Sequence, residues 1–360
     1  MKSIVKHALI GATLLAAATN AHATDSVKVF FLAGQSNMRG HGRIETGNGN
    51  VAGAVGSLRY LVNNDAANYG HLVDGGGNWD ARSDVWVWSH QGSNIGSTTT
   101  TTGDLGTTFG AGGDKFGPEL GFGHVLGDHY DEQVVLIKTA WGGKSLYEDF
   151  RPPSAGGTTG AYYTEMVSQM NTALADVATQ FAGQAIEIEG FVWHQGWNDR
   201  ADLTVIDNTT SPTTHLRDLA VAEYEDNLSD LIADLRTEFS TPDLKVVIGT
   251  TGMGPDATFD PNNREPAWYN LRPKALAQDL VAAQQAVGAA DPLASTVDAH
   301  PFWREDIVSP KKETEHWNQN AESYYLIGEG MGEAMVALVP EPSSLGLLAL
   351  GGLALLRRRR

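Results

Sequence analysis

Val27-Lys28-Val29-Phe30-Phe31-Leu32-Ala33 runs directly into Gly34-Gln35-Ser36-Asn37-Met38. Apart from the lysine, the first part consists of apolar, β-branched and aromatic residues, which predicts a buried strand, and Gly34 predicts the turn that ends it. Ser36 therefore follows the carboxyl end of a strand, where a serine can act as a nucleophile if a histidine reaches it. A Gly-x-Ser turn is as often the N-cap of a helix, so this motif alone leaves both interpretations open.

Apolar runs and helical patterns alternate along the rest of the chain. Further buried strands are expected at residues 133–139, 185–194 and 244–250. Helical patterns cover residues 117–130, 162–181, 216–238 and 272–287, and an amphipathic segment covers 320–338. Alternating strands and helices predict an α/β fold, a three-layer α/β/α sandwich with a mostly parallel central sheet. Active sites of such folds lie at the carboxyl ends of the strands.

The composition excludes several classes of protein. The 360 residues include 25 Lys and Arg, 43 Asp and Glu and no cysteine, which gives a formal net charge of −18. This balance disfavours a nucleic-acid-binding protein, because phosphate contacts need clustered cations. The lack of cysteine excludes disulfide scaffolds, thiolate zinc sites, iron–sulfur clusters and cysteine nucleophiles. With 41% hydrophobic residues, the chain is expected to be globular.

Neither the glycine-rich segments nor the histidines predict a cofactor. No phosphate-binding fingerprint, Gly-x-Gly-x-x-Gly or Gly-x-x-x-x-Gly-Lys-Ser/Thr, follows a predicted strand. His124, His194 and His300 belong to no His-x-x-x-His motif or carboxylate cluster. We therefore expect no nucleotide cofactor and no metal ion.

The first 23 residues have the features of a cleaved export signal. Lys2 and Lys6 precede an apolar stretch over residues 8–18, and Ala21-His22-Ala23 has the small–x–small form that signal peptidase accepts. The mature chain is therefore expected to start near Thr24, and the folded domain to cover residues 24–338.

Residues 339–360 have three parts in a fixed order. Val339-Pro340-Glu341-Pro342-Ser343-Ser344 precedes an apolar run over 345–356, and four arginines, 357–360, end the chain. This pattern resembles the PEP-CTERM sorting signal of Gram-negative bacteria. The resemblance implies export to the periplasm, cell surface or medium, with a transient C-terminal membrane segment and processing by signal peptidase and a membrane sorting protease. The arginines would hold the end of the segment on the cytoplasmic side.

Residues 41–115 form a region unusually rich in glycine and threonine. It holds 16 glycines and the run Thr98–Thr102, and only residues 84–89 predict a strand within it. A loop region of this length is uncommon in a compact domain unless it has a function. We expect an insertion that either shapes substrate binding or decorates the surface.

Three further segments place polar residues where chemistry is expected. Ala140-Trp141-Gly142-Gly143-Lys144-Ser145 follows the second predicted strand, and His194-Gln195-Gly196-Trp197-Asn198-Asp199 ends the third. Near the C-terminus stands Glu313-Thr314-Glu315-His316-Trp317-Asn318. An acid three residues before a histidine can accept the Nδ1–H of the imidazole while Nε2 faces outward.

These four segments, in this order and spacing, resemble the SGNH hydrolases, which have a flavodoxin-like fold. Gly34-Gln35-Ser36-Asn37-Met38 together with Trp193-His194-Gln195-Gly196 is similar to the sialate O-acetylesterase and acetylxylan esterase branch, carbohydrate esterase family six. The resemblance covers roughly residues 27–336, including Arg82–Val85, Phe116–Glu119 and Tyr224–Leu228. It implies an exported, cofactor-free serine esterase that removes acetyl groups from a carbohydrate.

The resemblance also implies roles for individual residues. Ser36 matches the nucleophile, His316 the general base, and Glu313 the acid that orients the base. The oxyanion hole maps onto the N–H groups of Ser36 and Gly143 and the side chain of Asn198. Gln35, Gln195 and His194 are expected to support the site.

Two departures from the family pattern leave alternatives open. The third segment reads Gln195-Gly196-Trp197-Asn198-Asp199 where the branch has Gln-Gly-Glu-x-Asp, so either Asn198 or Gln195 supplies the third oxyanion donor. The family's Asp-x-x-His is Glu313-x-x-His316 here. Orientation by Glu313, a serine–histidine dyad, or help from Asp298 beyond the preceding strand therefore all remain open.

Two tryptophans bear on the identity of the substrate. Trp141 and Trp197 flank the expected site and are either sugar-stacking or core residues. An acetylated carbohydrate is the expected substrate. Two other interpretations remain open: a non-catalytic carbohydrate-binding surface protein on an esterase fold, and an esterase of lipid or aryl esters.

Overall fold

The computed structural model describes residues 26–45, 55–201, 216–254 and 274–339. The predicted export signal and almost all of the predicted sorting segment therefore lie outside the described residues. The strands are β1 (Ser26–Gly34), β2 (Gly42–Arg43), β3 (Arg82–Gly92), β4 (Thr98–Leu105), β5 (Lys115–Phe116), β6 (Gln133–Trp141), β7 (Ala185–His194), β8 (Lys245–Gly249) and β9 (Ala294–Val297).

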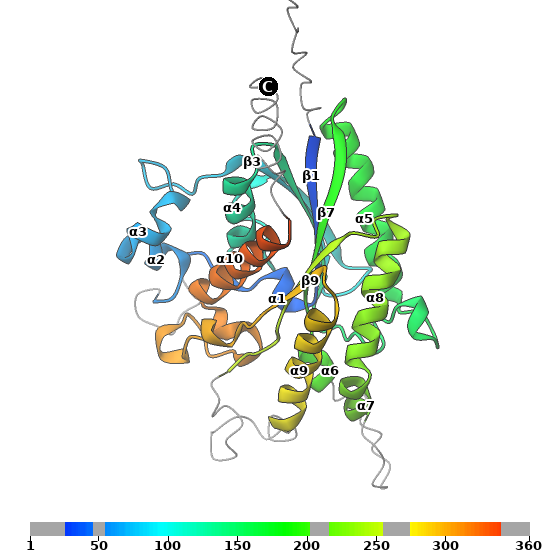
Figure 1. The fold of residues 1–360 in the computed structure, drawn as a ribbon. Helices are drawn as coiled ribbons and strands as arrows, with labels where there is room; N and C mark the ends of the chain where they lie inside the picture. Colours follow the sequence, from blue (N-terminus) through cyan, green and yellow to red (C-terminus); the bar gives the residue numbers. More distant parts are fainter. Residues whose placement is uncertain (1–25, 46–54, 202–215, 255–273, 340–360) are drawn as a thin grey trace, which may run out of the picture.

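Seven of these strands form the central sheet, in the order β4-β3-β6-β1-β7-β8-β9 (Figure 1). Every neighbouring pair is parallel except β3 and β4, which are antiparallel. β1 lies between β6 and β7, and all but one of its residues are buried. Parallel strands covered on both faces need apolar residues on both faces, which explains why β1 is apolar on either side of its one lysine, Lys28.

The α-helices are α1 (Ser36–Arg39), α2 (Leu58–Asn64), α3 (Ala66–Tyr69), α4 (Glu119–His129), α5 (Ala161–Gln180), α6 (Trp197–Ala201), α7 (Leu216–Ala222), α8 (Tyr224–Glu238), α9 (Lys274–Ala290) and α10 (Ala321–Leu338). Short 3-10 helices are η1 (Gly70–Leu72), η2 (Pro153–Ala155), η3 (His300–Phe302), η4 (Asp306–Val308) and η5 (Thr314–Gln319). No helix within the described residues is long and apolar enough to cross a membrane.

Helices cover the sheet on both faces, which confirms the predicted three-layer α/β/α sandwich. Phe30 and Leu32 of β1 pack into a core with residues of α4 and α10. Val29 and Phe31 point to the opposite face, into a second core with residues of α5, α8 and α9. Figure 1 shows α4 and α10 on one side of the sheet and α5 and α8 on the other.

The predicted strands and helices are present in the structure, but one helix is divided, and the structure contains elements that the sequence did not predict. Residues 216–238, predicted as one helix, form α7 and α8, which are separated at Glu223. Glu223 has φ −91° and ψ −1°, which interrupts the regular helix. The structure also contains the short β9 before Asp298.

The threonine run is the second difference. Residues 98–105 were expected to be loop, but they form β4, which pairs with β3. β-branched threonine favours strands, and an edge strand can expose its polar side chains. The expectation of a single strand within residues 41–115 is therefore wrong. The sequence does not predict β4, because residues 98–105 lack the apolar alternation that indicates a half-buried strand.

A fully buried ion pair joins the sheet to the segments around it. Nζ of Lys138, on β6, donates to Oε2 of Glu119 at 2.5 Å, and both side chains are 0% exposed. The same Nζ donates to the carbonyl oxygens of Arg39 at 2.9 Å and Phe109 at 2.8 Å. Oε1 of Glu119 accepts from the N–H of Gly117 at 2.7 Å. The pair thus anchors the end of α1, which carries Ser36, to the neighbouring strand.

Replacement of Lys138 by Met is expected to lower the free energy of unfolding by about 3–5 kcal/mol, because Glu119 would stay buried without its partner. The double variant Lys138→Met/Glu119→Leu should lose less, since no buried charge remains. Urea denaturation measures both. Lys312→Met is the matched control, because Lys312 pairs with Asp306 on the surface and should contribute less than about 1 kcal/mol. An equal loss in Lys138→Met and Lys312→Met would contradict this role of the buried pair.

Candidate functional site

A close backbone contact positions Ser36. A Cβ at Gly34 would lie 2.2 Å from the carbonyl oxygen of His194, and Gly34 has φ +155°. Only glycine fits this approach between the ends of β1 and β7. The chain then enters α1, whose first residue is Ser36, 7% exposed. Ser36 thus lies at the carboxyl end of the central strand, as predicted.

The Gln35 side chain joins the first segment to the third. Its Oε1 accepts from the N–H of Gly196 at 3.1 Å and of Asn198 at 3.2 Å, and its Nε2 lies 3.4 Å from Oδ1 of Asn198. Gln35 is 1% exposed. It therefore holds Asn198 beside the segment that carries Ser36.

Gly143 and Asn198 lie side by side. Gly143 has φ +66°, in the left-handed region that favours glycine, and a Cβ there would lie 3.7 Å from Nδ2 of Asn198. Since Oδ1 of Asn198 faces Gln35, its NH₂ group is on the side of Gly143. The structure thus brings together the two donors that the sequence pairs with the Ser36 N–H.

Gln195, the alternative third donor, is engaged elsewhere. Its Nε2 donates to the carbonyl of Lys144 at 2.9 Å and to Oδ2 of Asp199 at 2.5 Å, and the side chain is 2% exposed. An amide has only two N–H groups, so neither is left for a substrate. Of the two alternatives, the geometry favours Asn198, and Gln195 supports the loop.

Asp199 fastens the third segment to the loop after β6, a role that the sequence did not indicate. Its carboxylate accepts from the N–H groups of Leu146 at 3.0 Å and Tyr147 at 2.9 Å, besides Gln195. Burial raises the pKa of Asp199 to about 6, although these hydrogen bonds oppose the shift. The contact keeps the segment containing Gly143 next to Asn198.

His316 lies in η5, where the backbone is unusual. Trp317, Asn318 and Gln319 have φ values of 52°, 53° and 56°, three successive non-glycine residues in the left-handed region. Such conformations cost free energy and persist only where the surroundings hold them. Asn318 provides this support: its Oδ1 accepts from the N–H of Glu313 at 2.9 Å, and its Nδ2 donates to the carbonyl of Arg304 at 3.1 Å.

Glu313 contacts His316 directly. Its Oε1 hydrogen-bonds Nδ1 of His316, while its Oε2 pairs with Lys311 and accepts from Nε2 of Gln319 at 2.6 Å. Burial would raise the pKa of Glu313, but the hydrogen bonds and charges of His316 and Lys311 outweigh it and hold the pKa well below its usual value. The glutamate is therefore ionised and placed to orient the imidazole. Asp298, the other candidate, accepts instead from the N–H of His300.

Asn37 brings the nucleophile segment to the histidine segment. Its Nδ2 donates to the carbonyl of Glu315 at 3.1 Å, and its Oδ1 accepts from the hydroxyl of Tyr324 at 2.7 Å. Residues next to Ser36 and next to His316 are thus hydrogen-bonded to each other. Because Asn37 is 3% exposed, the contact is shielded from water.

His41 is a neighbour of the site that the sequence did not indicate. Its ring stacks on that of His316, with centroids 3.9 Å apart and planes within 2°. Its Nδ1 lies 3.1 Å from Nζ of Lys115, an arrangement in which the lysine donates. Burial, together with the charges of His316 and Lys115, holds the pKa of His41 well below its usual value. A neutral imidazole therefore covers one face of His316.

His41, Glu313 and His316 are also the one group of potential metal ligands within the described residues. The parallel rings direct their in-plane lone pairs into parallel planes, whereas a metal ion needs lone pairs that converge. Lys115 and Lys311 add positive charge to the group. The donor geometry does not fit a metal centre.

The remaining predicted residues, His194, Trp141 and Trp197, are buried. Nδ1 of His194 lies 3.1 Å from the carbonyl of Gly249, and burial lowers its pKa to about 4, so it supports the site as a neutral ring. Trp141 is 0% exposed and packs against Phe150 and Tyr162, so of the two interpretations left open, sugar stacking and core packing, the structure supports core packing. Trp197 is 8% exposed and has the Arg200 guanidinium 4.1 Å from its ring centroid, which gives no support to stacking.

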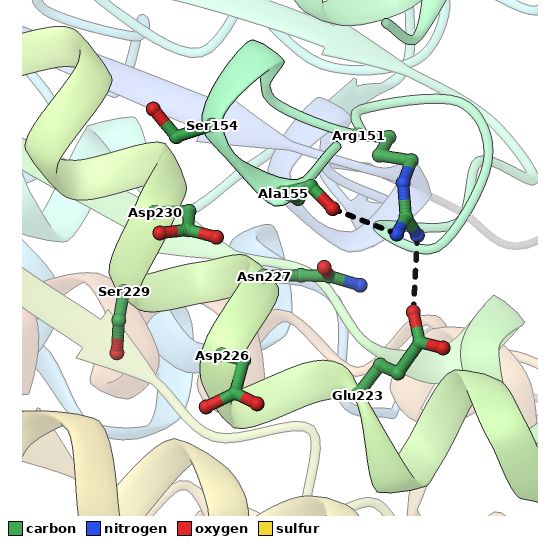
Figure 2. Close-up of a pocket in the computed structure, with 8 residues that line it drawn as sticks. All are labelled: Arg151, Ser154, Ala155, Glu223, Asp226, Asn227, Ser229 and Asp230. Atoms are coloured by element: carbon green, nitrogen blue, oxygen red, sulfur yellow. Dashed lines mark hydrogen bonds and ion pairs between the residues drawn. The ribbon is translucent and has the colours of Figure 1, made fainter. Parts of the chain in front are cut away.

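A separate pocket of about 440 Å³ lies between η2 and the start of α8 (Figure 2). Glu223, Asp226 and Asp230 line it, and Arg151 pairs with Glu223 at 3.1 Å. None of the predicted site residues lines this pocket.

Comparisons with known proteins identify the family. Residues 26–336 match the family model for "Carbohydrate esterase, sialic acid-specific acetylesterase", and residues 338–360 match the PEP-CTERM protein-sorting motif. None of the curated proteins compared with the chain matches it.

Solved structures resemble the chain at low sequence identity. A protein from Arabidopsis thaliana is 14% identical, with a TM-score of 0.50 over 86% of this chain and 98% of that one. A carbohydrate acetylesterase from Xanthomonas citri is 13% identical, with a TM-score of 0.47 over 86% of this chain and 56% of that one. NanS is 13% identical, with a TM-score of 0.41 over 78% of this chain and 79% of that one. The family match spans most of the chain and confirms the predicted resemblance: the chain belongs to the carbohydrate esterase family of sialic acid-specific acetylesterases.

Proposed function

We propose that the chain is an exported serine esterase that removes O-acetyl groups from carbohydrate through an acyl-enzyme intermediate. The observation that carries the proposal is the convergence of four segments: Ser36 at the end of β1, Gly143 and Asn198 beside it, and the Glu313–His316 pair next to them through Asn37. Nucleophile, base, orienting acid and oxyanion donors are the parts that acyl transfer requires.

The proposed reaction has two halves. Oγ of Ser36 attacks the acetyl carbonyl carbon while Nε2 of His316 takes the hydroxyl proton. The tetrahedral intermediate collapses, the C–O bond to the sugar breaks, and His316 gives its proton to the leaving sugar oxygen. Water, deprotonated by His316, then attacks the acetyl-serine. The bond between the acetyl carbon and Oγ of Ser36 breaks, His316 returns the proton to Oγ, and acetate is released. Glu313 stabilises the imidazolium that forms in each half.

The oxyanion would be bound by the N–H groups of Ser36 and Gly143 and by Nδ2 of Asn198. Gln35 and Asp199 fix these donors before a substrate arrives, since they hold Asn198 and the loop after β6. Donors fixed in advance cost no reorganisation when charge develops on the substrate oxygen.

The sorting motif supports the proposal that the enzyme is exported. A PEP-CTERM motif indicates export to the envelope of a Gram-negative bacterium, and we propose that signal peptidase and a membrane sorting protease process the two ends. The enzyme would then act on acetylated carbohydrate substrates in the periplasm, on the cell surface or in the medium.

Ser36→Ala tests the nucleophile. The purified wild-type protein should release acetate from acetylated xylan, acetylated sialic acid or p-nitrophenyl acetate, and the variant should lose this activity and its labelling by a fluorophosphonate. Full activity in Ser36→Ala would contradict the mechanism. No labelling and no hydrolysis by the wild type would favour the non-catalytic binding protein, and faster turnover of medium-chain acyl esters than of acetylated oligosaccharides would favour the lipid or aryl esterase.

Asn198→Ala tests the third oxyanion donor. The variant should lose about 10²–10³-fold in kcat, the usual effect of removing one such donor. Asn171→Ala is the matched control, because Asn171 is an exposed asparagine of α5 whose amide donates to the carbonyl of Val167 at 3.1 Å and to Glu238 of α8 at 3.5 Å, and to none of the predicted site residues. Equal kcat values in the two variants would show that Asn198 is not a donor to the oxyanion.

Glu313→Gln tests the orienting acid. It should lower kcat by about 10²–10⁴-fold, because the charge that stabilises the His316 imidazolium is lost. Since the pKa of Glu313 lies below its usual value, the carboxylate stays charged as the pH falls, and its protonation should not produce the acid limb of the pH–rate profile. Glu315→Gln, two residues away, should keep the wild-type rate. A Glu313→Gln enzyme as active as Glu315→Gln would favour the serine–histidine dyad.

A further inference from the structure

The separate pocket of about 440 Å³ lies between one face of α8 and the segment around η2 (Figure 2). Its lining residues on the helix are spaced by one helical turn, so they share a face: Glu223, Asp226, Asn227 and Asp230. Arg151 and Ser154 line the opposite wall. The pocket therefore joins two segments that are far apart in the sequence.

Two contacts hold these walls together. At one end, Nη1 of Arg151 donates to Oε2 of Glu223 at 3.1 Å. At the other end, the N–H of Ser154 donates to Oδ2 of Asp234 at 3.0 Å, and the hydroxyl of Ser154 donates to Oδ1 of the same residue. The pocket is therefore formed before any ligand binds, as small-molecule sites usually are.

Asn227 gives the pocket a polar group without a partner. The residue is 3% exposed, and its Nδ2 is buried and makes no hydrogen bond within the described residues. Figure 2 shows this amide directed from α8 into the space beside Arg151. A buried donor without an acceptor costs free energy, and a ligand that supplies the acceptor removes that cost.

Asp226 and Asp230 offer acceptors in the same pocket. Within the part of the chain that the structure describes, neither carboxylate forms an ion pair or a side-chain hydrogen bond. Burial, together with the charges of Asp234 and Asp226, raises the pKa of Asp230, although the charge of Arg151 opposes the shift. The pocket thus holds one unused donor and two unused carboxylates.

A ligand that fits these groups must both accept and donate hydrogen bonds. A single metal ion does not fit, because among the described residues only His41, Glu313 and His316 bring three ligand atoms together. An amine would donate to the carboxylates but would leave Nδ2 of Asn227 without an acceptor. A sugar hydroxyl accepts and donates at once, and the volume falls within the range of small-molecule sites, about 300–1,000 Å³.

Both walls of the pocket are hydrogen-bonded to segments of the proposed active site. The hydroxyl of Tyr224, the first residue of α8, donates to the carbonyl of Gln195 at 3.1 Å. On the other wall, Arg151 donates to the carbonyl of Tyr147 at 3.3 Å, and the N–H of Tyr147 donates to Asp199 at 2.9 Å. The pocket is therefore connected to the loop after β6 and to the segment after β7.

We propose that this pocket is a second carbohydrate subsite, which binds a neutral sugar unit of the chain whose acetylated unit lies at Ser36. Hydroxyls of that unit donate to Asp226 and Asp230, and one of them accepts from Nδ2 of Asn227. A neutral unit is preferred there, because the carboxylates repel an acidic one. The assignment to carbohydrate rests on the proposed function, and the subsite adds a preference for oligosaccharides over single acetylated sugars.

A binding experiment tests the pocket without hydrolysis. Calorimetry on Ser36→Ala protein uses three neutral, unacetylated probes, namely xylotetraose, cellotetraose and mannotetraose, and at least one of them should bind. Adding Asp230→Ala should weaken this binding about 10-fold, the effect of losing a hydrogen bond to a charged group. Asn227→Leu should weaken it too. Asp230 is partly exposed, so its variant stays informative if Asn227→Leu does not fold.

Glu225→Ala is the matched control, because Glu225 is an exposed carboxylate of the same first turn of α8 that does not line the pocket. It should keep the affinity of the Ser36→Ala protein. No binding of any probe, or equal affinities after Asp230→Ala and Glu225→Ala, would overturn the proposal. Binding of Ca²⁺ that Asp230→Ala abolishes, with no oligosaccharide bound, would assign the pocket to a cation and overturn it too.

Kinetics then separate the subsite from the reaction centre. In the otherwise wild-type enzyme, Asp230→Ala should raise KM about 10-fold for the acetylated form of the probe that binds most tightly. The same variant should leave kcat/KM for p-nitrophenyl acetate unchanged, because that ester has no sugar to place in the pocket. An unchanged KM for the oligosaccharide, or equal losses on both esters, would contradict a subsite. If the wild type hydrolyses neither ester, the proposed function fails, and the calorimetry still decides whether the pocket binds sugar.

Discussion

The contact between the ends of β1 and β7 determines the rest of the site. Because Gly34 has no side chain, the carbonyl of His194 can approach it closely, and the chain turns at once into α1 with Ser36 at its start. Gln35 is then placed to accept two N–H groups of the segment after β7. A single close approach therefore brings the first and third segments together, and a bulkier residue at position 34 would separate Ser36 from Asn198.

The opposite side of the site is held by a strained loop. Three left-handed residues after His316 are supported by Asn318, and Asn37 ties the loop to α1. Glu313 and the neutral ring of His41 fix the imidazole along its edge and its face. Backbone strain of this kind recurs at functional sites, where packing and hydrogen bonds elsewhere offset it. In this chain the buried pair of Lys138 and Glu119 adds a further anchor, because it holds the end of α1 to the sheet.

Much of the fold could be predicted from the sequence, and so could the segments that the structure brings together, because β1, its turn and the other segments are local patterns. Glu313 and His316 are close because they are three residues apart. The contacts of Asn37 with Glu315 and of Gln35 with Asn198 join residues far apart in the chain, and no local pattern predicts them. For the same reason His41 and Lys115 were missed, and the burial of Trp141 depends on contacts with Phe150 and with Tyr162 of α5 that the residues around Trp141 do not indicate. The strand β4 was missed because its exposed threonines lack apolar alternation.

In the proposed mechanism, Ser36 carries the acetyl group between the two halves of the reaction. The most direct measurement is mass spectrometry of peptides from wild-type protein quenched with acid during turnover of an acetylated sugar. We expect a transient acetyl group on the peptide that contains Ser36, formed before acetate reaches its steady rate of release. Acetate release with acetyl on another residue, or with no acetylated peptide under conditions that trap the intermediate in a known serine esterase, would contradict it.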